Sequence, residues 1–438
     1  MKKFIKKMLN KPMLFVFLVV LILYAPIALL MPADTSLRAI VTRVGIDGSP
    51  EGVEVSAVVF VPTPNTNYTE NYKLFSAEAE NVALAFQKIS RYVGKKIALN
   101  LAEMIVVNEE ISNGDLAETL DSLTRSTDIL NNVSLICTNE SAKDFLNAAL
   151  NLNSASDLNV EELIHYSQDK VYNTESNIES FYQGYFSPQK ISMLGYIELA
   201  SGTSGITTSG GSSASGSSGG GESSGGSSSS GASESEGQAT SSGQGESSGG
   251  GESQKKNTLL NEGRIAVYKD GTLNVVLTPE QLKGLNWLNP RCNESYLTVY
   301  NVTDEVFTNA TITFKLLRKK LNINVYFVND TPVFEGNLSL IMEVDQVKQE
   351  NLDSDIMQPE LSIISPELRN KVNMQAKKEF KVAQDLMIEN KLDLVHVYDY
   401  FKAFHPKKFE RFLNSLYDQS NFLEGVIFKL KITPHISL

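Results

Sequence analysis

Cysteine, histidine and tryptophan are scarce in this chain, which has two, four and one of them among 438 residues. Cys137 and Cys292 lie in different halves of the sequence, which excludes a fold built on a disulfide framework. Cys137 ends an apolar run over 133–137, so we expect it to be a small buried residue. A long-range disulfide between the two cysteines stays an alternative outside the cell.

The sequence also lacks the short motifs that carry catalysis. It contains no HExxH pattern, no cysteine pair with zinc spacing, no phosphate-binding loop and no GxSxG elbow. The histidines occur singly and are expected at the surface or in the core: His165, His396, His405 and His435. The sequence predicts no catalytic residue, no cofactor-binding residue, no metal ligand and no cofactor, and therefore no enzyme.

Two features leave weaker alternatives open. Neighbouring carboxylates are typical of solvated turns and helix starts, although a cell-wall hydrolase would also need a pair of them; they are Glu109-Glu110, Glu161-Glu162 and Asp353 with Asp355. The single tryptophan, Trp287, lies between Leu285 and Pro290, and this setting favours core packing over a sugar-stacking platform.

Positive charge is in the minority. The 39 lysines and arginines face 51 aspartates and glutamates, which gives a formal net charge of −12. A nucleic-acid partner is therefore excluded, because such a surface needs clustered basic residues. The acidic balance also argues against a folded region that lies broadly on anionic lipid.

One long apolar run stands near the N-terminus. Residues 13–31 carry no charged side chain and follow five lysines within the first eleven residues. Nineteen residues of helix span roughly 28 Å, close to the hydrocarbon thickness of a bilayer. We expect a single-pass membrane protein with its N-terminus in the cytoplasm and its domains outside. A cleaved signal segment, shortened by Pro26, is the alternative.

Composition divides the rest of the chain. Residues 201–257 are dominated by glycine and serine, a low-complexity composition that predicts a disordered linker. The expected organisation is a basic stub and transmembrane anchor over 1–35, an N-terminal mixed α/β domain over 36–200, the linker, and a C-terminal α+β domain over 258–438. The fold class is α+β overall, with two mixed α/β extracytoplasmic units joined by the linker.

Hydrophobic periodicity gives the elements of each domain. In the first, we predict strands over 37–46, 53–61, 98–107 and 132–138, with helices from Ser76 to Gly94, over 115–124 and over 141–150. In the second, we predict a hairpin over 262–277, strands over 296–302, 311–317, 321–328 and 338–344, and a closing strand over 422–432. Helices are predicted there over 281–288, from Ser365 to about 390, and over 406–417.

Several local strings follow one another along both predicted domains: Val44-Gly45-Ile46-Asp47, Ser76-Ala77-Glu78-Ala79, Gly94-Lys95-Lys96-Ile97-Ala98, Leu123-Thr124-Arg125-Ser126, the hairpin at 262–271, Gly284-Leu285-Asn286-Trp287-Leu288, Leu392-Asp393-Leu394 and His405-Pro406. Their order resembles that of the Ger(x)C spore germination family, the C subunits of nutrient germinant receptors. The resemblance implies a non-enzymatic membrane subunit that supports receptor assembly and response in spore germination. Its implied partners are integral membrane receptor subunits, while a small-molecule ligand stays unknown.

One departure from that family concerns the anchor. Members typically carry a lipid-bearing cysteine directly after the signal segment, whereas the first cysteine here is Cys137. We therefore expect the apolar helix to take over the tethering. A free-standing extracytoplasmic module that binds cell wall or a small ligand remains the alternative function.

Overall fold

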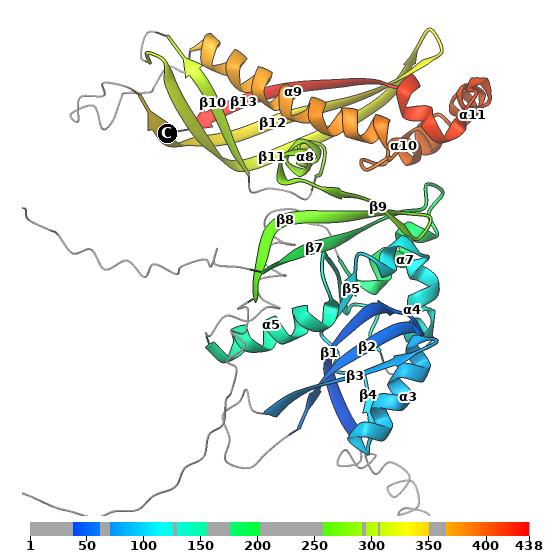
Figure 1. Ribbon diagram of the computed structural model, residues 1–438. Coiled ribbons are helices and arrows are strands. Elements are labelled where there is room, and N and C mark those ends of the chain that lie inside the picture. Colours follow the sequence, from blue (N-terminus) through cyan, green and yellow to red (C-terminus); the bar gives the residue numbers. More distant parts are fainter. Residues whose placement is uncertain are drawn as a thin grey trace, which may run out of the picture. The chain divides into compact units, whose positions relative to one another are not determined.

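A computed structural model describes residues 38–61, 71–125, 129–155, 176–201, 257–290, 295–304, 307–349 and 365–437. The expected anchor and linker lie outside these residues, as do Cys292, His165, Glu161-Glu162, Asp353 and Asp355. Among the described residues, no helix has the length and apolar character needed to span a bilayer. The described residues up to Leu199 and from Leu259 onward belong to one compact unit that contains two sheets (Figure 1).

The larger sheet has nine strands. Its order is β3 (Tyr72–Ala79), β2 (Gly52–Phe60), β1 (Arg38–Ser49), β5 (Met104–Asn108), β6 (Ser134–Thr138), β7 (Ile191–Ser201), β8 (Asn257–Lys269) and β9 (Thr272–Leu277), while β4 (Lys96–Ala98) pairs with β1. Strands β1, β5, β6 and β7 run parallel, and antiparallel pairs join β1 to β2, β2 to β3 and β8 to β9. This mixed pattern confirms the predicted α/β character of the first domain.

Helices cover both faces of this sheet (Figure 1). One face packs against α3 (Val82–Val93), α4 (Leu116–Thr124) and α7 (Ile178–Tyr185), and the other against α5 (Ala142–Ala155). Strand β5 contributes side chains to both cores, because successive side chains of a strand point to opposite faces of the sheet. Ile105 and Val107 enter the core under α3 and α4, whereas Met104 and Val106 enter the core under α5.

The Val44-Gly45-Ile46-Asp47 string fixes the position of α5. Gly45 faces the first turn of this helix, and a Cβ atom added there would come within 3.0 Å of Leu146 and 3.2 Å of Ala142. The Asp47 carboxylate accepts hydrogen bonds from the main-chain N–H groups of Ala142 at 2.6 Å and Lys143 at 3.0 Å. A small residue and a capping carboxylate thus let the helix pack closely on β1.

The predicted helix start at Ser76 is wrong. Residues around Ser76 form β3, in which Ser76 pairs with Ser56 of β2. The helix begins only at Val82, where the Asn81 side chain caps the Leu84 N–H at 3.0 Å. Its end at Gly94, with φ of 69°, agrees with the prediction. The prediction extended the helical period of 79–89 backwards across residues that edge pairing holds as a strand.

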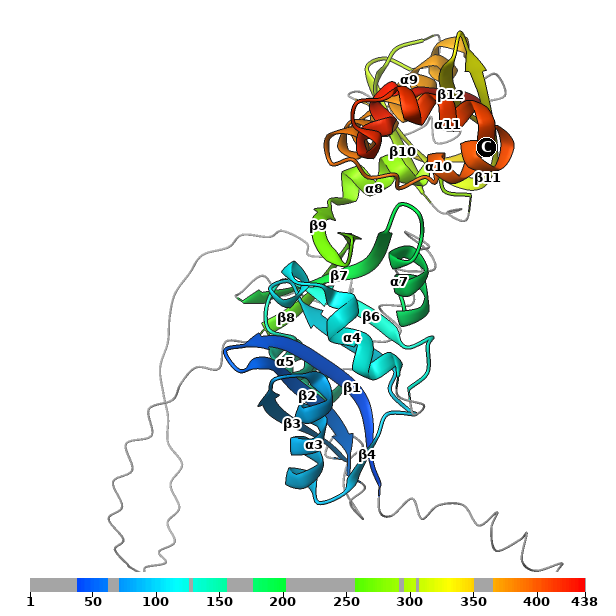
Figure 2. The ribbon, with the colours of Figure 1, turned by 90° about the vertical axis from the view of Figure 1, so that its right-hand side faces the viewer.

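The smaller sheet has the order β10 (Tyr296–Val302), β11 (Ala310–Val328), β12 (Thr331–Lys348) and β13 (Ile427–Ser437). Its first three strands are antiparallel, and β13 runs parallel to β12. Helix α9 (Pro366–Glu389) crosses one face of this sheet (Figures 1 and 2). The same core includes residues of α8 (Pro279–Asn286), α10 (Val397–Phe404), α11 (Pro406–Ser415) and the 3-10 turn η5 (Gln419–Gly425).

Strand β11 replaces two predicted strands, 311–317 and 321–328, with one. A bulge between Leu316 and Arg318 shifts the alternation by one residue and turns Lys319 inward. There the Lys319 Nζ atom donates to the main-chain oxygens of Asn286 at 2.5 Å and Asn289 at 2.6 Å. A buried cation therefore satisfies carbonyls at the C-terminal end of α8.

Strand β8 belongs to both cores, which the sequence analysis did not foresee. Ala266 and Tyr268 pack into the core under α4 and α7, whereas Ile265 and Val267 pack into the core that contains α8 and α9. The hairpin at 262–277 was expected to open the second domain. In the structure this hairpin forms the end of the nine-stranded sheet. The side chains on one of its faces pack into the second core.

Strands β7 and β8 are neighbours although 202–256 separates them in sequence. Asp270 donates a main-chain hydrogen bond to Lys190 at 3.0 Å, and Arg264 pairs with Glu198 at 2.5 Å. Because residue numbers rise on one strand as they fall on the other, the two strands run antiparallel. The chain thus leaves β7 and enters β8 at the same end of neighbouring strands.

Candidate functional site

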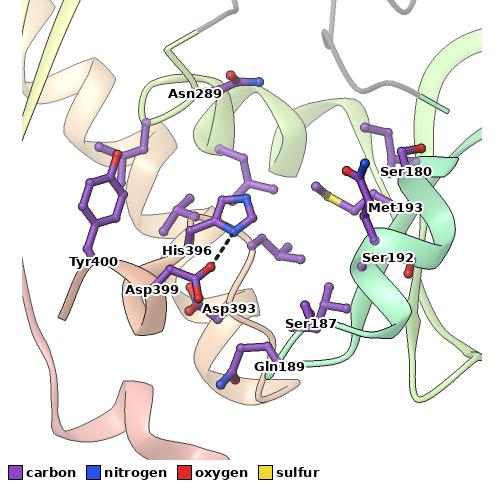
Figure 3. A pocket seen from close by; sticks show the side chains of 18 of the residues that line it. Ser180, Ser187, Gln189, Ser192, Met193, Asn289, Asp393, His396, Asp399 and Tyr400 are labelled. Atoms are coloured by element: carbon purple, nitrogen blue, oxygen red, sulfur yellow. Dashed lines mark ion pairs between the residues drawn. The ribbon is translucent and has the colours of Figure 1, made fainter. Parts of the chain in front are cut away.

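A cleft of about 510 Å³ lies between the α7–β7 segment and the elements that follow β9 (Figure 3). One side consists of α7 and the loop after it, and the other of the α8 end and the loop that precedes α10. The apolar lining includes Ile191, Met193 and Leu285, while the polar lining includes Ser187, Gln189, Asn289, His396 and Tyr400. An apolar floor with convergent polar groups is typical of a binding cleft.

The turn of the β8–β9 hairpin contacts both sides of this cleft. Asp270 pairs with Lys190, in the loop after α7, at 2.7 Å. Lys269 donates through Nζ to the main-chain oxygen of Lys391 at 2.9 Å, in the loop before α10. A tight hairpin turn of this type needs two residues in the left-handed conformation. Asp270 (φ 52°) and Gly271 (φ 81°) both adopt it, and aspartate and glycine are residue types that tolerate it.

The loop before α10 is fixed by Asp393, which is almost completely buried. Its carboxylate accepts hydrogen bonds from the main-chain N–H groups of Val397 at 2.8 Å and Tyr398 at 2.7 Å. Burial nevertheless raises the pKa of Asp393 above its usual value, because desolvation outweighs these hydrogen bonds. The Leu392-Asp393-Leu394 string therefore has a structural role as the anchor of the α10 N-terminus.

His396 follows this anchor with a φ of 59°, a conformation that a non-glycine residue seldom adopts. Its ring points into the cleft and its Nδ1 atom lies 3.3 Å from the carboxylate of Asp399 (Figure 3). Of the two positions expected for the lone histidines, surface or core, His396 takes the surface, because 70% of its side chain is exposed. His405 differs in that its Nε2 atom lies 2.9 Å from the main-chain oxygen of Val325, against the core.

No residue of this cleft was predicted from the sequence as a site. Helix α7 was not predicted either, although Asn177 and Ser180 form a capping box that marks its start. The wall residues on the other side come from a loop and a helix end, which periodicity does not reveal. In the described part of the chain, no group of three or more His, Cys, Asp or Glu side chains could hold a metal ion.

A buried polar cluster lies on the face of β8 that packs into the core under α4 and α7. The Tyr268 hydroxyl donates to Ser112 Oγ at 2.9 Å, and Ser112 donates to the main-chain oxygen of Asn108 at 2.9 Å. Cys137 is fully buried next to them, as predicted, and burial raises the pKa of its thiol to about 12. Such a thiol is not a nucleophile at neutral pH, so the cluster is part of the core.

The remaining residues singled out in the sequence are also structural. Trp287 is 2% exposed and donates through its indole N–H to Glu379 on α9 at 3.0 Å, which confirms core packing. Glu109 and Glu110 lie in the turn after β5, where Asn108 Oδ1 accepts the Glu110 N–H at 2.5 Å. The described carboxylate pair thus occupies a turn, as expected.

Two protein-family models match the chain. The Spore germination protein N-terminal domain matches residues 34–199, and the Spore germination B3/GerAC-like C-terminal domain matches residues 263–436. No curated protein matches the chain. Among solved structures, the crystal structure of the GerBC protein is similar, with 14% identity, coverage of 90% of this chain and 97% of that chain, and a TM-score of 0.45.

The two matches include nearly every described strand and helix, and the second begins inside β8, the strand that both cores share. Their order along the chain agrees with the resemblance drawn from the local strings. Members of this family are non-enzymatic, so the prediction that the chain is not an enzyme is confirmed. The chain belongs to the GerAC-like family of spore germination proteins, the C subunits of germinant receptors.

Proposed function

We propose that this chain is a membrane-anchored scaffolding subunit that supports assembly of a germinant receptor and its response in spore germination. The observation that carries the proposal is the match of both folded halves, in order, to domains of GerAC-like germination proteins. The family is associated with the membrane and with the other germinant receptor subunits. The partners would be the integral membrane subunits of the same receptor.

The proposed anchor is the apolar segment at 13–31, which would place the folded domains outside the cytoplasm. A bilayer helix would hold the chain beside the partner subunits and offer them a surface for helix packing. This tether would take the place of the lipid-bearing cysteine that is typical of the family.

Affinity purification tests the proposal. A tagged full-length chain is isolated from detergent-solubilised spore membranes, and co-purifying proteins are identified by mass spectrometry. We expect integral membrane subunits to be recovered with the full chain and to be strongly reduced with a chain that lacks residues 1–35. Recovery of the intact chain without any integral membrane partner would contradict the proposal.

A second candidate function, binding of a small polar ligand, is favoured by the cleft beside His396 and Tyr400. Its mixed lining would suit a molecule with both an apolar part and hydrogen-bonding groups. Thermal unfolding of the full chain, measured with a panel of free amino acids and monosaccharides, tests this function. A rise in Tm that disappears in Tyr400→Ala supports it, and unchanged unfolding with every compound counts against it.

A further inference from the structure

No helix or strand of the described residues covers the second face of the smaller sheet. Core side chains of β11, β12 and β13 point toward α8, α9 and α10, and the alternate side chains point away from these helices. We call the outward residues between the Lys315–Glu343 pair and the Asn324–Glu335–Lys429 row the open face. Its members on β11 and β13 are exposed: Lys315, Arg318, Lys320, Asn322, Asn324, Lys429, Lys431, Thr433 and His435.

The open face has an excess of positive charge, in contrast to the chain as a whole. Five cations (Lys315, Arg318, Lys320, Lys429 and Lys431) stand against two carboxylates (Glu335 and Glu343), in a chain of net charge −12. The bulge in β11 produces this clustering, because it places Arg318 and Lys320 on the same outward side as Lys315. Without it, the alternation would direct Arg318 and Lys320 into the core.

Local ion pairs neutralise only part of this charge. Lys431 pairs with Glu335 at 3.0 Å, and Lys315 lies 3.7 Å from Glu343. Within the described residues, Arg318 and Lys320 have no ion pair, and Lys429 lies over the Tyr326 ring at 5.8 Å. These three cations therefore remain available to an external anion.

Register places the three available cations on the same face of the sheet. Arg318 and Lys320 are two residues apart on β11, and Lys429 lies two strands away on β13. Strands about 4.8 Å apart and residues about 3.4 Å apart put the Cα atoms of these cations roughly 7–23 Å from one another. Exposed apolar side chains lie among and beside them, with Ile341 between Arg318 and His435 and Ile427 one row beyond Lys429.

We propose that the open face docks on an anionic phospholipid surface, through contacts of Arg318, Lys320 and Lys429 with lipid phosphates. A sheet face that carries both cations and exposed apolar side chains can contact the lipid phosphates and the apolar boundary beneath them. The acidic remainder of the chain is repelled by the same surface, so the charge distribution selects this face. The proposal goes beyond the receptor function, and it does not depend on partner subunits.

Lysine footprinting of the full-length chain tests the proposal. The chain is reconstituted in vesicles of phosphatidylcholine alone or of phosphatidylcholine mixed with phosphatidylglycerol. It is then labelled with uncharged NHS acetate, and acetylation is quantified by mass spectrometry. We expect labelling of Lys315, Lys320, Lys429 and Lys431 to fall about threefold or more in the anionic vesicles and to recover at high salt. Lys377 and Lys378, which are exposed on α9, should be labelled equally in both.

Matched variants separate docking from a general effect of charge. In Arg318→Gln/Lys320→Gln/Lys429→Gln, the protection of Lys315 and Lys431 should disappear. In Lys377→Gln/Lys378→Gln/Lys402→Gln, which removes the same charge from exposed positions on α9 and α10, it should persist. Equal labelling of the open face in both kinds of vesicle overturns the proposal. Protection that appears only in native spore membranes also overturns it and assigns the face to a protein partner.

Discussion

Gly271 packs directly against the carboxylate of Asp115, and its main-chain oxygen accepts a hydrogen bond from Leu116 at 3.0 Å. The hairpin turn thereby meets the N-terminus of α4, where Asp115 also caps Ala117 at 2.9 Å. Glycine is needed here twice over, because φ is 81° and an added Cβ atom would overlap the Asp115 side chain.

Gly271→Ala should therefore lower the free energy of unfolding by about 2–4 kcal/mol, through backbone strain and displacement of Asp115. Urea unfolding followed by circular dichroism measures the change. Gly48→Ala is the matched control, because a Cβ atom at Gly48 would meet nothing within 4 Å. A loss from Gly271→Ala that is no larger than the loss from the control would show that the turn does not pack as described.

Asp393→Asn should destabilise the loop before α10 by about 1–3 kcal/mol, because the Val397 and Tyr398 N–H groups use different carboxylate oxygens and the amide replaces one of them with an NH2 group that cannot accept. The raised pKa of Asp393 also predicts a pH dependence. The folded protein binds this proton more tightly than the unfolded chain does. The stabilising contribution is therefore complete below the unfolded value of 3.8 and is lost as pH rises through the folded-state pKa.

Denaturant unfolding of the wild type and Asp393→Asn at a series of pH values tests this sign. The difference in free energy of unfolding between the wild type and Asp393→Asn should shrink as pH rises from 3.8 through the folded-state pKa of Asp393. A difference that grows over the same pH range would mean that hydrogen bonding outweighs burial at Asp393.

Asp418 should titrate with a pKa of about 2, because Lys391 Nζ donates to its carboxylate at 2.7 Å and Ser420 supplies two further hydrogen bonds. Carbon-detected NMR titration measures this pKa. In Lys391→Gln it should rise toward 3.8, whereas Lys377→Gln should leave it unchanged. An equal pKa in the wild type and Lys391→Gln would rule out the contact.

Trp287 and Cys137 report on different cores, which β8 joins. Because Ile265 and Ala266 pack into opposite cores, we expect the two cores to unfold together. Tryptophan fluorescence follows the first core, and alkylation of Cys137, whose thiol is buried and has a pKa of about 12, follows the second. The two urea midpoints should coincide; separate midpoints would mean that the shared strand does not couple the cores.

Shortening the 202–256 segment should leave the fold intact, because this segment connects the neighbouring antiparallel strands β7 and β8. Replacing 203–255 by a short glycine-rich turn should raise the free energy of unfolding by about 1–2 kcal/mol, since a shorter loop loses less entropy on closure. Thermal unfolding checks this. A spacer between independent domains would instead give no stabilisation, and a Tm that falls would contradict the strand arrangement.

Local patterns in the sequence were sufficient to predict most individual helices and strands. Strong signals marked β1, β2, α4, α5 and the β8–β9 hairpin, and the cap at Ser365 marked the start of α9. Other features depended on pairing between distant residues. Ser76 lies in a strand because β2 holds it there, and Lys319 points inward because of a bulge that its own neighbours do not reveal.

The candidate surfaces were harder to predict than the elements. The cleft combines α7, β7 and the loop before α10, so it exists only once β8 has brought the two cores together. The open face arises from register between β11 and β13, which lie about 100 residues apart. The overall composition predicts an acidic chain, whereas the fold brings five of its cations together on one face.

The adjacency of β7 and β8 also makes this chain a natural candidate for division into two pieces. A protease cut within 202–256 would leave a first fragment ending in β7 and a second beginning with β8, each presenting the strand edge that the other lacks. Burial of Ala266 and Tyr268 against α7 would hold the fragments together after the cut. The same site would therefore suit a split-reporter design, in which two separately expressed fragments regain the native sheet on meeting.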